Sequence, residues 1–354
     1  MENSIKNILV APLNWGLGHA TRCIPIIREL EKNGFMPILA SDGVALQLLQ
    51  KEFPHLQSLE LPSYEIEYAK NGADFKWKLI KNSPKMIEAI FAEKKIVKKW
   101  IAKYNLQGII SDNRLGVYSK KIPSVFITHQ LNVLSGKTTW ISSKLHQHFI
   151  KKFTECWIPD IQENPNLTGK LGHLKKSSLN LKYLGPLSRL EKRELPIKYD
   201  LMVILSGPEP QRTYLEQKLK NEVRLFAGKV LFIKGIIESE QKKEQDENVT
   251  YYNFMTSSEI ENAFNESEIV LCRSGYTTVM DLAKLGKKAF FIPTPGQFEQ
   301  EYLAKRLKRN GFVPYVKQDD FRIENLLEAK LYGGLPQLKK EIYWKQLFIL
   351  FEGE

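Results

Sequence analysis

A histidine follows two closely spaced glycines in the stretch "LNWGLGHATR" near the start of the sequence. The apolar run before this loop predicts a strand, and the glycines permit a sharp turn and close approach of a ligand. Because N–H groups at the start of the following helix attract anions, Gly16 and Gly18 are candidate contacts of an anionic substrate. The imidazole of His19 is a candidate general base near neutral pH. The alternative is a glycine-rich turn with a capping histidine, in which Trp15 packs the loop instead of forming an apolar wall for the substrate.

A second loop places a cation, a hydroxyl group and a glycine between a predicted strand and a predicted helix. Arg273, Ser274 and Gly275 follow the apolar run "EIVLC", and the helix is expected to begin near Thr277 or Thr278. Together with the N–H groups of the first helical turn, these residues suit the two phosphates of a diphosphate. An ordinary helix N-cap uses the same residue types, so the loop alone leaves both interpretations open.

Polar side chains continue beyond this loop. Asp281 lies about one turn into the helix and could accept hydrogen bonds from ribose hydroxyls. In "PTPGQFEQEYLA", the residues Gln297, Glu299, Gln300 and Glu301 crowd the start of another predicted helix. Because the carboxyl ends of parallel strands share one edge of a sheet, these groups would form a polar wall beside the phosphate site.

Two apolar runs in the first half of the sequence also end in polar residues. Asp112, Asn113 and Arg114 follow "LQGIIS", and His129 with Gln130 follows "IPSVFIT". At the carboxyl ends of neighbouring strands these groups could contact a second substrate or assist a base. Asp112 is therefore a second catalytic candidate, although it could equally be an ordinary turn or cap residue.

The scaffold for these loops is predicted from alternating strand and helix patterns. Apolar runs of strand length alternate with amphipathic stretches, a βαβ rhythm typical of mostly parallel, doubly wound sheets. The rhythm starts again after "KYLGPLSRLEKRELPIKYD", so two Rossmann-like α/β domains facing a cleft are expected. We place them at residues 1–187 and 188–337, with a hinge near 185–199 and a C-terminal helix within 338–354 that could pack back on the first domain. Helices are expected at about Ala20–Asn33, Val44–Glu52 and Gln211–Phe226.

Length and composition limit the class of protein. The 354 residues exceed what one hydrophobic core usually serves, in agreement with two domains. Lys and Arg outnumber Asp and Glu by 52 to 40, and the net charge of +12 favours anionic partners. No zinc-finger, RNP-type or basic-zipper pattern supports nucleic acid. The three cysteines lack CxxC spacing, and neither a signal peptide nor a membrane-spanning run is recognisable, so a cytoplasmic location is expected.

Taken together, these residues resemble the GT-B glycosyltransferases, in particular the family 28 group that contains the N-acetylglucosaminyltransferase making lipid II and the plant galactolipid synthases. The most specific part of the likeness is "CRSGYTTVMDLAKLGKKAFFIPTPGQFEQEYLA". The order of the glycine-histidine loop, the connector "GPLSR" and this signature extends it over most of the chain. The resemblance implies transfer of a sugar from a UDP-linked donor to an acceptor hydroxyl, with inversion and with neither a metal nor a cofactor.

In that family the donor lies mainly on the C-terminal domain, and the acceptor lies on the N-terminal domain. Combined with the positions above, the resemblance assigns catalysis to His19 and Asp112, and the acceptor side to Trp15, Arg114 and His129. The donor-binding residues expected in this way are Gly16, Gly18, Arg189, Arg212, Met255, Arg273, Ser274, Gly275, Thr277, Thr278, Asp281 and Gln300.

Three positions depart from the family pattern. Asp281 stands where the family usually has Glu, and Glu301 stands where it has a second Gln, so the nucleotide and the sugar stay open. The loop "LSGPEPQR" replaces a glycine-rich loop, and its two prolines have no N–H to offer to phosphate. Arg212 and Arg189 would then supply the charge, unless both are solvated surface arginines.

Other functions remain as alternatives. The form "GLGHATR" also resembles the UDP-sugar hydrolase of pseudaminic acid synthesis, a relative with the same fold that uses water as acceptor. A nucleotide-sugar hydrolase is therefore the second hypothesis, and a non-enzymatic nucleotide- or RNA-binding protein is the third. Aromatic and basic residues around Phe75 and Trp77 suit an anionic membrane surface, which adds a peripheral location on the inner face of the membrane and a glycan or lipid-linked acceptor.

Overall fold

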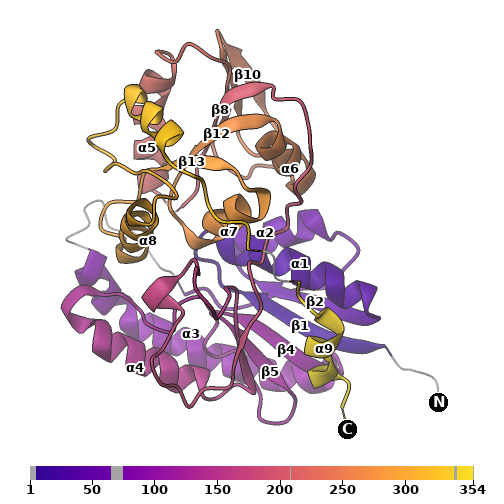
Figure 1. The fold of residues 1–354 in the computed structure, drawn as a ribbon. Helices are drawn as coiled ribbons and strands as arrows, with labels where there is room; N and C mark the ends of the chain where they lie inside the picture. Colours follow the sequence, from indigo (N-terminus) through magenta and orange to yellow (C-terminus); the bar gives the residue numbers. More distant parts are fainter. Residues whose placement is uncertain (1–4, 65–74, 208, 339–340, 354) are drawn as a thin grey trace. The chain divides into compact units, whose positions relative to one another are not determined.

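The protein divides into two compact units, each built around one sheet (Figure 1). The computed structural model describes residues 5–64, 75–207, 209–338 and 341–353, and the side chains of residues 75–84 are outside this description. The N-terminal unit contains the first three strands, Leu79–Leu187 and the C-terminal segment, and the C-terminal unit contains Ser188–Leu338. The side chains of Phe75 and Trp77, expected at a membrane surface, therefore lie outside the described residues.

The N-terminal unit has a seven-stranded parallel sheet in the order β3-β2-β1-β4-β5-β6-β7. Its strands are β1 (Lys6–Pro12), β2 (Phe35–Ser41), β3 (Ser58–Glu60), β4 (Leu106–Asp112), β5 (Ser124–Ile127), β6 (Glu155–Ile158) and β7 (Leu181–Tyr183). Its helices are α1 (Gly18–Lys32), α2 (Gly43–Glu52), α3 (Phe75–Lys103), α4 (Thr139–Ile150) and α9 (Trp344–Phe348), with 3₁₀ turns η1 (Gly136–Thr138), η2 (Gly169–Leu171) and η4 (Ile349–Phe351). The strand order reverses between β1 and β4, which is where ligands bind in such sheets.

The carboxyl ends of three neighbouring strands are level at this reversal. Asp112, the last residue of β4, pairs in register with Pro12 of β1 and with Ile127 of β5. The strand β1 is apolar and buried from Ile8 onward, as expected for a strand covered on both faces. The loops that carry His19, Asp112 and His129 therefore start side by side.

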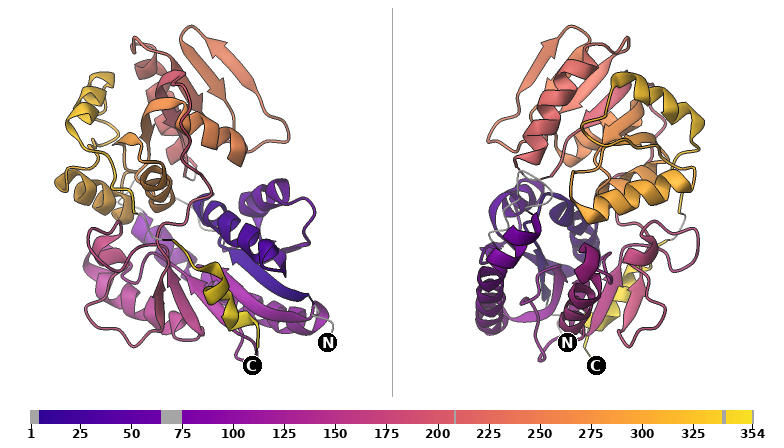
Figure 2. Two further views of the ribbon diagram at one scale, coloured as in Figure 1. Left: turned by 45° about the vertical axis from the view of Figure 1, so that its right-hand side comes forward. Right: turned by 90° about the vertical axis from the view of Figure 1, so that its left-hand side faces the viewer.

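The C-terminal segment packs on the N-terminal unit. The ring of Phe348 lies 5.7 Å from that of Phe35 and 6.5 Å from that of Trp157. The ring of Phe351 lies so close to Gly108 that no larger residue would fit there without a shift. In both views of Figure 2 this segment, drawn in yellow, lies beside the strands of the unit. Aromatic packing thus ties the end of the chain to its first half.

The C-terminal unit has a six-stranded sheet in the order β10-β11-β9-β8-β12-β13. All pairs are parallel except the hairpin of β10 and β11. Its strands are β8 (Tyr199–Ile204), β9 (Val230–Ile233), β10 (Lys243–Asp246), β11 (Val249–Tyr252), β12 (Ser267–Cys272) and β13 (Lys288–Phe291). Its helices are α5 (Gln211–Val223), α6 (Ser257–Asn265), α7 (Tyr276–Leu285) and α8 (Phe298–Arg309), followed by the 3₁₀ helix η3 (Ile323–Leu331). The strand order reverses between β8 and β12.

The loops of this unit also start at one level. Cys272 at the end of β12 pairs in register with Ile204 of β8 and with Phe291 of β13. The connections that begin at residues 205, 273 and 292 therefore share the carboxyl edge of the sheet, as expected. The helix boundaries differ from the expected ones by a few residues, as is usual at helix ends. Helix α1 begins at Gly18, and helix α5 ends at Val223.

Candidate functional site

A histidine and an aspartate from different strands meet at the carboxyl edge of the N-terminal sheet. His19 lies in the first turn of α1, and its Nδ1 atom is 2.8 Å from Oδ1 of Asp112 at the end of β4. Asp112 is completely buried, and His19 keeps part of its side chain exposed. The structure therefore joins the two predicted catalytic residues in one hydrogen bond.

An arginine missed by the sequence interpretation completes this arrangement. Both Nε and Nη2 of Arg22 donate to the two carboxylate oxygens of Asp112, and Nη1 lies 3.1 Å from Nδ1 of His129. Nη2 also lies 2.8 Å from Nδ1 of His19. We call these four residues the N-terminal cluster. The signal for Arg22 was its spacing, because residues three apart on a helix share a face and Arg22 follows His19 by three.

Burial and charge set the protonation states of the N-terminal cluster. Burial alone would raise the pKa of Asp112, but the charge of Arg22 together with His19 and their hydrogen bonds lowers it to about 2. Burial lowers the pKa of His19, and the Arg22 charge adds to this against the opposing effect of Asp112. At neutral pH the carboxylate is ionised and the imidazole is neutral. Since the carboxylate accepts the proton of Nδ1, the lone pair of His19 lies on Nε2, as a general base requires.

The loop before His19 has one packed side and one open side. Trp15 is partly buried against Leu13, Tyr64 and Ala89, so it packs the loop. Gly16 has a φ of +75°, which favours glycine, and a Cβ atom built there would meet nothing within 4 Å. The backbone at Gly16 is thus open to a ligand, while the indole holds the loop against the unit.

Arg114 does not face a substrate, and the expectation of an acceptor contact is wrong. Its side chain is fully buried, and Nε and Nη1 donate to the carbonyl oxygens of Pro12 and Pro62. The same guanidinium forms ion pairs with Glu93, at 2.8 Å, and with Asp42. Arg114 therefore joins β1, the segment after β3 and α3 inside the unit.

Arg273 is also a structural residue in the C-terminal unit. Its side chain is only 1% exposed, and Nη1 donates to the carbonyl oxygens of Ile292 and Pro293 at 3.1 Å. Nη2 donates to the carbonyl of Gln211 at 3.0 Å and to Oε1 of Gln318 at 2.7 Å. Burial lowers the pKa of Arg273 to about 9, which leaves it charged at neutral pH. The predicted direct contact with phosphate is therefore contradicted, because this guanidinium is enclosed and clamps the loops together.

The neighbouring loops are joined around Gly275. The hydroxyl of Ser274 donates to the carbonyl of Gln300 at 2.8 Å, and Oε1 of Gln300 accepts from the backbone N–H of Thr294 at 2.8 Å. The Nε2 atom of Gln300 lies 3.9 Å from where a Cβ on Gly275 would lie. The amide N–H groups of Gln300 are thus directed toward the glycine that precedes α7.

Backbone groups form the accessible part of this loop. The N-cap of α7 is Gly275, which has no side chain to cap the first turn, and the first turn contains no acidic residue. Gly275, Thr277 and Thr278 are partly exposed, unlike Arg273 and Ser274. The start of α7 is therefore the part of the predicted diphosphate site that a ligand can reach.

The two arginines expected to assist phosphate binding differ. Arg212 is buried between Glu209 and Glu216, with ion-pair distances of 2.5 and 2.6 Å. Because these two carboxylates neutralise its charge, the structure contradicts the predicted contact of Arg212 with phosphate. Arg189 donates to the hydroxyl of Ser257 at 2.8 Å and remains partly exposed at the start of the C-terminal unit. Arg189 thus stays a candidate for donor binding.

Three further predicted or noted positions lie on the same unit. Asp281 accepts a hydrogen bond of 2.6 Å from the hydroxyl of Ser188, and burial raises its pKa to about 6. Glu301 accepts from the backbone N–H of Gly296 at 3.1 Å, so it holds the loop before α8. Met255 follows β11 and is partly exposed. The two carboxylates that depart from the family pattern both have partners within the chain.

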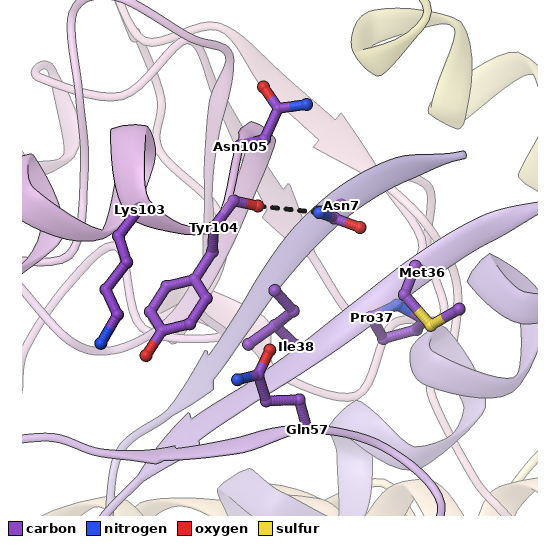
Figure 3. A pocket seen from close by; sticks show the side chains of 8 residues that line it. All are labelled: Asn7, Met36, Pro37, Ile38, Gln57, Lys103, Tyr104 and Asn105. Carbon is purple, nitrogen blue, oxygen red and sulfur yellow. Dashed lines mark hydrogen bonds between the residues drawn. The ribbon is translucent and has the colours of Figure 1, made fainter. Parts of the chain in front are cut away.

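A shallow pocket of about 350 Å³ lies at the other edge of the N-terminal sheet (Figure 3). It is lined at the amino ends of β1 and β2 by Asn7, Met36 and Pro37, and by Tyr104 ahead of β4. The side chain of Asn7 donates to the carbonyl of Tyr104 at 2.7 Å. The pocket lies at the amino ends of the strands, whereas the N-terminal cluster lies at their carboxyl ends, where catalytic groups of such sheets gather. The two are therefore separate.

Known proteins match both the C-terminal unit and most of the chain. Residues 202–341 match the model of the glycosyltransferase family 28 C-terminal domain. A relative from Haemophilus ducreyi, a UDP-N-acetylglucosamine–N-acetylmuramyl-(pentapeptide) pyrophosphoryl-undecaprenol N-acetylglucosamine transferase, is 24% identical over 91% of this chain and 88% of its own. The protein of the same name from Buchnera aphidicola is 25% identical over 77% of this chain and 75% of its own.

Solved glycosyltransferase structures share the fold. MurG from Acinetobacter baumannii superposes with a TM-score of 0.57 at 12% identity, covering 98% of this chain and 99% of that one. The glycotransferase of kitacinnamycin reaches a TM-score of 0.60 at 13% identity, covering 92% and 89%. Together with the two sheets described above, this likeness confirms the predicted α/β GT-B fold.

Proposed function

We propose that the chain is a GT-B glycosyltransferase of family 28 and that it transfers a sugar from a UDP-linked donor to the hydroxyl of a lipid-linked acceptor. The observation that carries the proposal is the N-terminal cluster, which orients a neutral imidazole at the strand-order reversal of its sheet. The relatives' names supply UDP-N-acetylglucosamine as the first donor to test and a pyrophosphoryl-undecaprenol lipid as the first acceptor.

In this proposal His19 is the general base. Its Nε2 atom takes the proton of the acceptor hydroxyl while the oxygen forms a bond to the anomeric carbon of the donor. The bond from that carbon to the diphosphate breaks with its electron pair going to the phosphate oxygen, so the configuration at the carbon is inverted. Asp112 stabilises the imidazolium that forms, because its carboxylate already accepts the Nδ1 proton.

The departing diphosphate is the second charge that the enzyme must stabilise. We place it at the start of α7, where the helix dipole and the backbone of Gly275 to Thr278 favour an anion. The amide of Gln300 and the guanidinium of Arg189 are the side-chain candidates for further contacts. The proposal includes transfer without a metal, with the helix start in the role of the cation.

The test is an assay of purified protein with UDP-N-acetylglucosamine, with and without a polyprenyl-diphosphate-linked acceptor, in buffer with and without EDTA. Acceptor-dependent UDP release that is unchanged by EDTA supports the proposal. Rapid release of stoichiometric free sugar without acceptor would establish instead the alternative, a nucleotide-sugar hydrolase. Absence of turnover with every UDP-sugar and acceptor tried would contradict both.

A lipid-linked acceptor requires contact with a membrane surface, and helix α4 offers one. Trp140, Ile141 and Leu145 are 72%, 61% and 59% exposed, and Lys137 and Lys144 lie beside them. Trp favours the interface of a bilayer, apolar side chains insert among the acyl chains, and each Lys near anionic headgroups adds about 1 kcal/mol. Among the residues that the structure describes, no helix has the length and apolar character needed to span a bilayer. The proposal therefore includes peripheral binding of this helix to an anionic membrane.

Sedimentation with vesicles tests this part. Full-length protein should sediment with vesicles that contain anionic phospholipid, and the double substitution Trp140→Ser with Leu145→Ser should abolish this while activity on a short-chain soluble acceptor stays. A matched control is Leu225→Ser with Leu327→Ser, two exposed residues of the C-terminal unit. Equal sedimentation of both double variants would overturn the assignment to α4.

A further inference from the structure

The guanidinium of Arg22 connects every member of the N-terminal cluster. It is 2% exposed and forms a two-point contact with Asp112, whose carboxylate also accepts from the thiol of Cys23 and lies 2.8 Å from Nδ1 of His19. Its remaining terminal nitrogen, Nη1, points to Nδ1 of His129 at 3.1 Å. A planar guanidinium holds a carboxylate at two points, which a lysine ammonium cannot do.

The contact with His129 fixes the tautomer of that histidine. An arginine only donates hydrogen bonds, so Nδ1 of His129 accepts at 3.1 Å, which places the ring proton on Nε2, 3.5 Å from the side-chain amide of Gln130. His129 is 5% exposed, and its imidazole is therefore an enclosed partner that holds Arg22. The residue expected on the acceptor side thus contacts the charged centre of the cluster.

The tautomer of His19 is the opposite one. Its Nδ1 atom has one acceptor, Asp112, and one donor, Arg22, both at 2.8 Å, and the side-chain amide nitrogen of Asn113 lies farther away at 3.5 Å. Nε and one N–H of Nη2 donate to the two oxygens of Asp112, and an ionised carboxylate 2.8 Å from Nδ1 favours a proton on that atom over a lone pair. The proton on Nδ1 of His19 is therefore shared with the ionised carboxylate, and Nε2 carries the lone pair.

We propose that Arg22 and His129 are positioning residues for the base, with His129 holding Arg22 and Arg22 holding Asp112 against Nδ1 of His19. The inference rests on the proposed function in one respect, the role of His19 as base. The four residues come from α1, the end of β4 and the segment after β5. Any substitution that frees the guanidinium should therefore let the carboxylate turn and the imidazole change its tautomer.

Nitrogen NMR of the full-length protein with ¹⁵N-labelled histidine tests the geometry without any turnover. The wild type should show His19 protonated at Nδ1 and His129 protonated at Nε2, assigned by single substitution of each histidine. Arg22→Lys should convert His19 to a mixture of tautomers. Observation of His129 protonated at Nδ1 in the wild type would overturn the inference.

Kinetics separate positioning from substrate contact. Arg22→Lys should lower kcat about tenfold or more, with the KM for donor and acceptor within about twofold, because no substrate contact is lost. Arg28→Lys is the matched control, since Arg28 lies on the same helix, has 48% of its side chain exposed and pairs with Glu52 at 3.5 Å. His129→Leu should resemble Arg22→Lys, and His129→Gln should restore at least half of kcat, because its amide oxygen can accept from Arg22.

Two outcomes distinguish this inference from the proposed function. A protein with the expected tautomers but without sugar transfer would overturn the proposed function and leave the arrangement of the cluster intact. An active enzyme in which His129→Leu raises the acceptor KM and leaves kcat unchanged would overturn the positioning role. If Arg22→Lys does not fold, the His129→Leu and His129→Gln pair still carries the test.

Discussion

The carboxyl edges of the two sheets use their charged side chains in opposite ways. In the N-terminal unit Arg22 and Asp112 pair around one imidazole, so the charges orient a chemical group. In the C-terminal unit Arg273 and Arg212 are enclosed by carbonyl oxygens and carboxylates, so the charges hold loops together. The reachable groups there are the backbone of Gly275 and the side chains of Thr277 and Thr278, which are partly exposed. The comparison teaches that a base needs an oriented side chain, whereas a diphosphate site can be built from a helix start.

The strand ends themselves differ between the units. The strands β4 and β12 occupy the same place in their sheets, next to the first strand of each unit. β4 ends in Asp112, a carboxylate directed at α1, and β12 ends in Cys272, a thiol whose pKa is raised by burial. The last residue of the strand at the strand-order reversal is therefore a charged hydrogen-bond partner in the N-terminal unit and a buried, uncharged thiol in the C-terminal unit.

The largest expected effect is on catalysis, at His19. His19→Ala should lower kcat by about 10² to 10⁴, the usual contribution of a general base. Thermal stabilisation of the protein by UDP should persist, because the loop assigned to the diphosphate belongs to the other unit. His148→Ala is the control, since His148 is exposed on α4. If His19→Ala loses UDP binding but turns over bound donor at an unchanged rate, the N-terminal sheet would bind the donor and the base would have to lie elsewhere.

The next effect is on stability, at Arg273. Arg273→Met should lower the free energy of unfolding by about 3–5 kcal/mol, because four buried acceptors lose their donor. Urea unfolding measures the loss, and UDP affinity of the folded fraction should fall by less than about tenfold. If Arg273→Met is stable but no longer binds UDP, the prediction of a direct contact between Arg273 and phosphate would be supported against the structure.

A pH-dependent effect is expected at Asp281. Burial raises the pKa of Asp281 in the folded protein to about 6, above its value in the unfolded chain. Ionisation of this carboxyl group therefore lowers the free energy of unfolding as the pH rises from about 4 to 6. Asp281→Asn removes this cost, and the stability advantage of the variant should grow over this range by at most about 3 kcal/mol. The measurement is urea unfolding at pH 4.5 and pH 7.5. Asp319→Asn, at an exposed position, should show no such trend, and an equal trend in both variants would refute the assignment.

The smallest effect is expected at Gly275. A methyl group there meets the Gln300 amide at 3.9 Å, so Gly275→Ala should fold and lose at most about 1 kcal/mol of stability, because alanine is a weaker N-cap than glycine. If the diphosphate lies on the start of α7, the methyl group should weaken UDP binding about tenfold, or about 1.4 kcal/mol. Gly333→Ala, where the added atom is equally unhindered, should not affect UDP binding. Unchanged affinity in Gly275→Ala would move the nucleotide away from this loop.

Much of the fold was predictable, because strands and helices follow from hydrophobic periodicity along short segments. The alternation of patterns predicted two parallel-sheet α/β domains, and the structure confirms this fold. The hairpin of β10 and β11 was not predicted, since "KEQD" is a polar strand without the apolar run that marks the others. His19 and Asp112 were each recognised as candidates from their places after apolar runs.

The sequence by itself determined the local chemistry of this protein: which loops carry glycines, which strand ends carry polar groups, and where α1 and α7 can begin. Only the tertiary structure decided which of those groups act together. Asp112 meets Arg22 across 90 positions, and Arg273 meets Gln211 across 62. Propensity and periodicity act over a few residues, whereas the partner of a buried charge depends on strand register and on the packing of distant segments. For that reason Arg22 was missed, and the enclosed arginines Arg114, Arg212 and Arg273 were assigned to ligands.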